Sequence, residues 1–95
     1  MRAITLKAVQ AFNKGRKFKQ SHTEVRIAGD TVSLYLHNNQ IAERSPDGFY
    51  VTNAGWASRT TKERLNGLDG VHIIQKNWNW YLNGKEWNGG WYRIG

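Results

Sequence analysis

The sequence contains no cysteine, one proline and one methionine. The absence of cysteine excludes disulfide bonds, thiolate zinc sites and cysteine nucleophiles. Long apolar runs are also missing, because no segment approaches the ~20 residues that a transmembrane helix requires. The N-terminal segment is interrupted by Lys7 and lacks the continuous apolar stretch and cleavage site of a signal peptide. We therefore expect a cytoplasmic protein that does not associate with membranes.

Motifs for catalysis or metal binding are missing too. The sequence has no glycine-rich phosphate loop and no nucleophile elbow. None of His22, His37 and His72 has a second histidine or a carboxylate at the spacing of metal ligands. Glu43 and Asp47 are close in sequence, but a carboxylate pair that flanks a turn is usually just solvated. We expect a protein that is not an enzyme and that uses neither a metal nor another cofactor.

Acidic residues are scarce in the N-terminal quarter of this basic chain. The formal net charge is +7, and residues 1–26 hold seven lysines and arginines against Glu24 alone. We define the densest part as the basic cluster, which consists of Lys14, Arg16, Lys17 and Lys19. Such asymmetry indicates an acidic partner, which is a nucleic acid, an acidic protein or a membrane surface. The alternative is a basic surface that serves solubility alone.

The 95 residues predict a single domain, spanning residues 1–95, that begins with a helix and an antiparallel meander. Apolar residues recur at helical spacing over residues 4–14, and Gly15 suits the C′ position. Thr5 is a candidate N-cap, although a slightly earlier start fits as well. A tight turn is expected at Asn38-Asn39, because asparagine tolerates the left-handed conformation. Alternating patterns predict strands over residues 23–28, 32–37, 40–44 and 49–52.

The second half predicts a short helix and a second meander. Thr60 and Glu63 match a capping box, which predicts a helix over residues 60–66. A strand is expected over residues 71–76. Turn signals at Asn83-Gly84 and at residues 88–90 then divide the aromatic C-terminal stretch. They predict three further strands over residues 80–82, 85–87 and 91–94.

The fold class is therefore α+β, with two antiparallel meanders, an N-terminal helix and one short helix between the meanders. Four of the five tryptophans lie in the C-terminal stretch. Trp80 and Leu82 share one face of a strand and are expected in the core. Because the domain is small, we expect three of the five tryptophans to be buried.

Several short segments of the sequence resemble those of a family of small proteins that tailed bacteriophages encode. They are Asn53-Ala-Gly-Trp56, the segment over residues 58–66 and the segment from Trp80 to Trp87, with shorter matches at residues 23–25, 35–37 and 41–42. The resemblance spans roughly residues 20–92. It implies a phage origin and action in the cytoplasm of the infected bacterium, and it brings no catalytic residues.

These patterns favour a non-enzymatic protein that binds DNA or RNA. The basic cluster is expected to contact phosphates, while Tyr35 and Trp78 are expected to stack on bases. Arg59, Lys62 and Arg64 flank the expected N-terminus of the second helix, where anions bind well. A solvated helix that Thr60 and Glu63 merely cap is an equal alternative. At the level of function, the alternatives are a phage effector that inhibits a host protein and an accessory virion protein.

Overall fold

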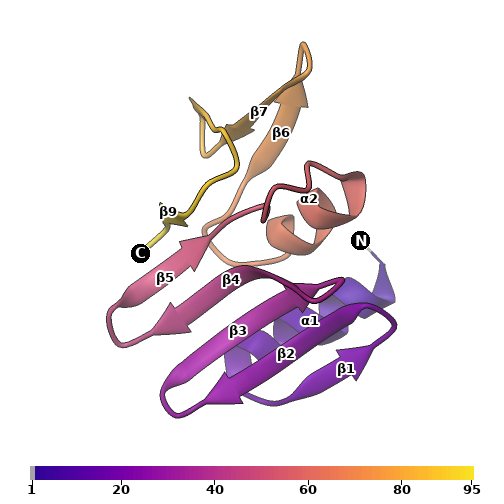
Figure 1. Ribbon diagram of the computed structural model, residues 1–95, viewed down its shortest axis with the longest axis vertical. Coiled ribbons are helices and arrows are strands. Elements are labelled where there is room, and N and C mark those ends of the chain that lie inside the picture. The colour runs from indigo at the N-terminus through magenta and orange to yellow at the C-terminus, as the bar shows by residue number, and fades with distance from the viewer. Residues whose placement is uncertain (1) are drawn as a thin grey trace.

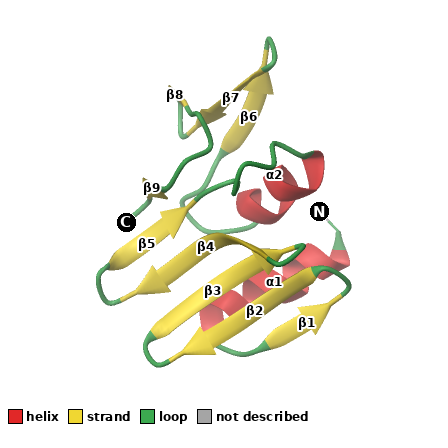
Figure 2. Ribbon diagram, in the orientation of Figure 1, coloured by secondary structure: helices red, strands yellow, loops and turns green. Residues whose placement is uncertain are grey.

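The computed structural model describes residues 2–95, which form two helices and nine strands (Figures 1 and 2). The helices are α1 (Ala3–Lys14) and α2 (Arg59–Asn66). The strands are β1 (Phe18–Gln20), β2 (Thr23–Ala28), β3 (Thr31–Leu36), β4 (Asn39–Ser45), β5 (Gly48–Val51), β6 (Ile73–Lys76), β7 (Asn79–Leu82), β8 (Lys85–Glu86) and β9 (Tyr92–Arg93). The α+β class and the mainly antiparallel sheet are confirmed.

Five consecutive strands and the last one form a six-stranded antiparallel sheet in the order β1-β2-β3-β4-β5-β9. Helix α1 packs against β1, β2 and β3 and lies behind the sheet in Figure 1. The face toward α1 carries the core, in which Val25 pairs with Leu34, and Leu34 with Ala42. Phe12 of α1 is buried against this face, with its ring 5.8 Å from that of Phe49. The alternation of the strands therefore decides which side chains α1 covers.

The ends of α1 agree only partly with the sequence patterns. Gly15 ends the helix in the left-handed conformation, and its N–H faces the carbonyls of Ala11 and Phe12. Thr5 is not the N-cap, because the helix begins at Ala3, which confirms the earlier start as the correct alternative. Thr5 is instead buried within the helix, where its hydroxyl donates a hydrogen bond to the Glu63 carboxylate. A tertiary contact thus uses the hydroxyl that the pattern assigned to a cap.

The turn between β3 and β4 lies one residue earlier than the sequence indicates. His37 and Asn38 are its central residues, and both have positive φ. The expected turn at Asn38-Asn39 is therefore wrong by one position. A bulge follows in β4, because Tyr35 pairs with Gln40 whereas Leu34 pairs with Ala42. The shift moves His37 out of the strand and into the turn.

Helix α2 begins at Arg59, and Ser58 caps it. The Ser58 hydroxyl accepts a hydrogen bond from the backbone N–H of Thr61. The expected cap at Thr60 is wrong, because Thr60 already lies inside the first turn. Glu63 does not close a capping box, since its carboxylate binds Thr5, Arg2 and Arg64.

The second meander is divided between two sheets. Strands β6, β7 and β8 form a small antiparallel sheet, as the turn signals indicate. The third expected strand does not join it, because β9 pairs with β5 across the molecule. The physical reason lies at Gly89, whose carbonyl accepts hydrogen bonds from the Asn53 N–H and the Thr52 hydroxyl. These bonds hold the chain beside the end of β5 before β9 begins.

Only two tryptophans belong to the core. Trp80 and Trp87 are buried, with ring centroids 6.2 Å apart. The burial of Trp80 and Leu82 is confirmed, and Leu82 pairs with Ile73. The expectation of three buried tryptophans is wrong, because the other three are more than half exposed. They lie in the connections between strands and helices, which the small core does not reach.

Candidate nucleic-acid interface

The six-stranded sheet has one face that α1 does not cover. We call it the open sheet face, and Figure 1 shows it toward the viewer with no helix in front of it. Its side chains follow from the strand register, in which Glu24 pairs with Lys19 and Tyr35, and Glu43 with Ser33 and Tyr50. Its charged, aromatic and larger polar members are Lys19, Glu24, Arg26, Ser33, Tyr35, Gln40, Glu43, Tyr50 and Arg93.

Two tyrosines of this face each have a guanidinium group over the ring. The Cζ atom of Arg26 is 3.8 Å from the ring centroid of Tyr35, and that of Arg93 is 5.8 Å from the centroid of Tyr50. Arg26 also donates a hydrogen bond of 3.0 Å to Glu24. This bond lowers the pKa of Glu24, which keeps the carboxylate charged beside the guanidinium. The face thus combines flat aromatic and guanidinium surfaces with a locally balanced charge.

The basic cluster reaches the open sheet face through Lys19 and Lys17, which line one hollow with Glu24 and Arg26. Lys14, at the end of α1, is exposed, as are Arg16 and Lys17 in the following loop. Lys19 is exposed on β1, in the row that continues through Glu24 to Tyr35. Of the predicted phosphate contacts, Lys19 therefore shares a row with the predicted stacking residue Tyr35 and Lys17 shares a hollow with Lys19, whereas Lys14 belongs to the helix that covers the other face.

The three predicted cations of α2 do not form one surface. Arg59 is exposed and Lys62 is half-buried. Arg64 is only 3% exposed, and its guanidinium donates hydrogen bonds to Thr23, Thr5 and Glu63. Burial lowers the pKa of Arg64, which the adjacent carboxylate of Glu63 partly offsets. Arg64 is therefore a structural residue and does not extend the predicted phosphate surface.

Trp78 lies apart from the other predicted site residues. It occupies the turn between β6 and β7, and its side chain is 92% exposed. Figure 1 shows this turn at the end of the molecule opposite β1. The predicted stacking roles of Tyr35 and Trp78 thus fall on separate surfaces.

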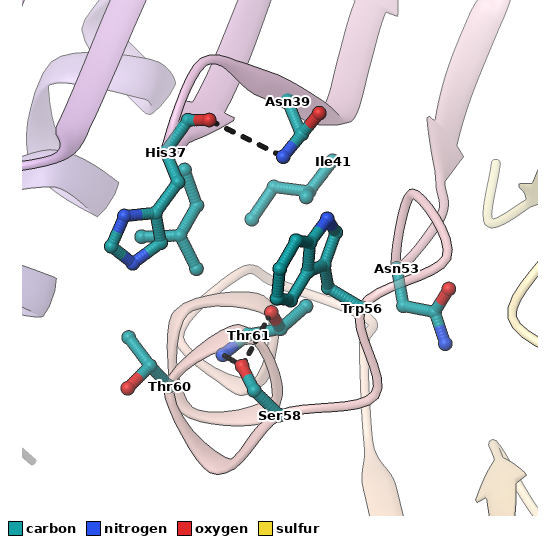
Figure 3. A pocket seen from close by; sticks show the side chains of 9 residues that line it. His37, Asn39, Ile41, Asn53, Trp56, Ser58, Thr60 and Thr61 are labelled. Atoms are coloured by element: carbon teal, nitrogen blue, oxygen red, sulfur yellow. Dashed lines mark hydrogen bonds between the residues drawn. The ribbon is translucent and has the colours of Figure 1, made fainter.

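A pocket lies between the β3–β4 turn and the first turn of α2. We call it the Trp56 pocket, and its cavity has a volume of about 410 Å³. It is lined by Leu36, His37, Asn39, Ile41, Asn53, Trp56, Ser58, Thr60 and Thr61 (Figure 3). The sequence analysis assigned no binding role to these residues. The available signal was the tryptophan at position 56, which closely precedes the segment over residues 60–66 that was expected to be helical.

The imidazole rings of His22 and His37 stack next to this pocket. Their centroids are 4.5 Å apart, and the backbone N–H of His37 donates to the carbonyl of His22. Within residues 2–95, no group of three histidine or carboxylate side chains is arranged to hold a metal ion. The same residues contain no helix with the length and apolar character needed to span a bilayer.

The sequence reasoning also missed part of the open sheet face. Arg26 and Tyr50 fall on the polar phase of their strands, so alternation was a signal for both. Arg93 gave no such signal, because its position depends on the pairing of β9 with β5. The residues named from sequence as one interface thus divide into an assembled part, a buried arginine and a distant tryptophan.

These features define a small α+β protein whose sheet has one uncovered face of aromatic and charged side chains. The chain belongs to the Kyanoviridae Gp96 protein family, whose model matches residues 1–95. This membership confirms the resemblance to phage proteins. No curated protein and no solved structure matches the chain.

Proposed function

We propose that the protein binds single-stranded nucleic acid across the open sheet face, in the cytoplasm of the infected host cell. The observation that carries the proposal is the pair of tyrosines, Tyr35 and Tyr50, each with a guanidinium plane over its ring on a sheet face that no helix covers. Aromatic rings on a sheet and arginine planes both stack on unpaired bases. Such stacking tolerates any base sequence, because every base has a flat face.

The distribution of charge supports separate roles for the two parts of this surface. On the open sheet face, Glu24 and Glu43 offset two of the three positive charges of Lys19, Arg26 and Arg93, so the face suits bases better than phosphates. The neighbouring basic cluster consists of exposed cations and suits the phosphate backbone. Bases in a duplex are already stacked and paired, so this division favours single strands.

The proposal is tested by fluorescence anisotropy with a labelled single-stranded oligonucleotide and the matching duplex over a series of salt concentrations. About four phosphate contacts predict a slope of about −3 for log K against log salt on single strands. Changing Lys17→Glu and Lys19→Glu together is expected to flatten the slope. Tyr50→Ala is expected to weaken binding by about 1–3 kcal/mol without changing the slope, because it removes stacking.

A matched control is available on the small sheet. Lys76→Glu with Lys85→Glu makes the same change of charge at two exposed positions outside the interface. We expect this variant to retain most of the affinity and the slope. An equal loss of affinity in the two double variants would mean that net charge alone explains the effect. The absence of single-strand binding at low salt would contradict the proposal.

A second candidate is an effector that binds a host protein through the β6–β7 hairpin. Trp78 and its neighbour Asn77 both have positive φ, which is unfavourable for a residue as bulky as tryptophan. The side chain is nevertheless presented to solvent, and Ile74 on the same hairpin is 44% exposed. Exposed tryptophans commonly anchor protein interfaces by filling a pocket on the partner.

The two candidates differ in their response to nuclease and to substitution. An effector is expected to bind one purified host protein after nuclease treatment, and Trp78→Ser is expected to abolish this binding. The same variant is expected to leave oligonucleotide binding by the open sheet face unchanged. A complex that survives nuclease but is indifferent to Trp78→Ser would contradict the hairpin candidate.

A further inference from the structure

The Trp56 pocket has the shape and lining of a site for a flat, largely apolar ligand. Its volume of about 410 Å³ lies in the range of small-molecule sites. The aliphatic side chains of Leu36 and Ile41 line it and are buried. Trp56 stands in the centre of Figure 3 and remains 63% exposed, so its indole has a free surface to offer. In the same view, the imidazole of His37 lies on the other side of the cavity.

Six of the nine residues that line the pocket are polar, and none of them is an aspartate, glutamate, lysine or arginine. The Asn39 amide N–H donates to the carbonyl of His37, which leaves its amide oxygen as an acceptor. The hydroxyls of Ser58 and Thr61 bond to one another, 2.9 Å apart, at the start of α2. In Figure 3 the methyl group of Thr60, and not its hydroxyl, points toward His37. Amide and hydroxyl groups of this kind match the hydrogen-bonding edge of a nucleobase.

The charge around the pocket suits a ligand that carries phosphate. No carboxylate is among the residues that line it. Arg59, which is exposed, follows the capping residue Ser58 in the chain. The partial positive charge of a helix N-terminus adds to the same effect. An acidic or neutral ligand is therefore favoured over a cationic one.

The pocket is also connected to the open sheet face. His37 lines the Trp56 pocket and a second, more polar hollow that Lys19, Ser21, His22, Glu24 and Asn38 complete. Lys19 and Glu24 belong to the open sheet face. A strand that runs along that face therefore reaches the pocket past His37.

We propose that the Trp56 pocket holds one unstacked nucleobase of the strand bound on the open sheet face, with the base against the indole of Trp56. This inference rests on the proposed function and adds a specific base site to it. Trp56 supplies the stacking surface, the hydroxyls of Ser58 and Thr61 lie beside it for the base edge, and Arg59, next to Ser58 in the chain, supplies a cation for the adjoining phosphate. A pocket that encloses a single base gives the protein a means of preferring one base over the others.

The test uses the whole protein labelled with ¹⁵N, so that each tryptophan indole N–H gives its own resonance. The probes are AMP, GMP, CMP and UMP, and the corresponding nucleosides. We expect saturable shifts of the Trp56 resonance, stronger for one base and weaker for its nucleoside. Trp56→Leu is expected to abolish mononucleotide binding and to weaken oligonucleotide binding about fivefold or more. Trp91→Leu is the matched control, because Trp91 is 53% exposed but does not line the pocket.

The outcomes separate the pocket from the open sheet face. In one outcome, oligonucleotides bind with the expected salt dependence, the Trp56 resonance does not shift and Trp56→Leu does not change the affinity. The pocket proposal is then overturned and the proposed function stands. If mononucleotides saturate Trp56 but longer strands bind no more tightly, the base site is supported and the proposed function fails. If neither probe binds, both are overturned. Thermal unfolding of Trp56→Leu and Trp91→Leu verifies that each variant is folded.

Discussion

The guanidinium of Arg64 and the hydroxyl of Thr5 lie 2.6 Å apart, although 59 positions separate them in the chain. The same guanidinium donates to Thr23 Oγ1, so one buried side chain joins α2 to α1 and to β2. The Thr5 hydroxyl in turn donates a hydrogen bond to the Glu63 carboxylate, which extends the network. Buried polar groups of this kind stabilise a fold only while all of them are paired.

We expect Arg64→Ala to destabilise the protein by about 3 kcal/mol. The substitution leaves the hydroxyls of Thr5 and Thr23 buried with fewer partners, and it removes the buried charge that faces Glu63. Urea denaturation gives the free energy of unfolding. Arg59→Ala, at an exposed position of the same helix, is the control and is expected to change it by less than about 0.5 kcal/mol.

We expect the protein to lose stability in acid because the pKa of Glu63 is lowered in the folded state. The hydrogen bond from Thr5, followed by the charges of Arg2 and Arg64, holds the pKa of Glu63 below its ordinary value of 4.5. In the unfolded chain the ordinary value returns, so this contribution is complete above that pH and is lost as pH falls through the folded-state pKa.

Urea denaturation from neutral pH into acid measures this effect. The free energy of unfolding is expected to fall less steeply with decreasing pH in Glu63→Gln than in the unsubstituted protein. Glu86→Gln, which changes an exposed carboxylate on β8, is the control. A decline that is as steep in Glu63→Gln as in the unsubstituted protein would contradict the assignment.

Ser58 and Thr60 are expected to differ in their effect on α2. Ser58→Ala removes the hydroxyl that accepts from the Thr61 N–H and is expected to cost about 1 kcal/mol. Thr60→Ala lies inside the helix and is expected to change the free energy of unfolding by less than about 0.5 kcal/mol. Thermal unfolding of the two variants distinguishes them, and the reverse order would restore the capping box that the sequence pattern indicates.

Gly89 is expected to tolerate no side chain. A Cβ atom there would lie 2.2 Å from the Asn53 side-chain nitrogen, and the backbone φ is +92°. Gly84 has a similar φ of +87° but faces open space, so Gly84→Ala measures the backbone cost alone. We expect Gly89→Ala to lower the free energy of unfolding by about 1–3 kcal/mol more than Gly84→Ala does, which is the range typical of overpacking. Equal melting temperatures for the two variants would show that the contact with Asn53 yields easily.

Many features of this fold could be predicted from short sequence patterns, because each depends on residues close together in the chain. Alternation placed Val25 and Leu34 on the core side of adjacent strands, and the glycine at position 15 ended α1 where expected. Trp80 and Leu82 were predicted to be buried from one strand period. These features depend on neighbours within a few residues, which a sequence displays directly.

The errors arose where a distant partner decided the outcome. The hydroxyl of Thr5 fits an N-cap by its position, yet it serves Glu63 and Arg64 from another helix. Likewise, Tyr92 has the pattern of a third meander strand, yet it pairs with Val51 because the Gly89 carbonyl is held beside β5. Competition between local and long-range hydrogen bonds has no signature in a short window of sequence.

The candidate site divides in the same way. The sequence by itself determined that the N-terminal quarter is basic, since charge is a property of composition, and alternation put Tyr35 on the polar phase of its strand. Only the tertiary structure decided that Lys19 and Tyr35 share a row of one sheet, that Arg64 is buried and that Trp78 lies at a distant turn. Strand pairing and helix packing determine which charges reach solvent together, and both depend on contacts between residues far apart in the chain.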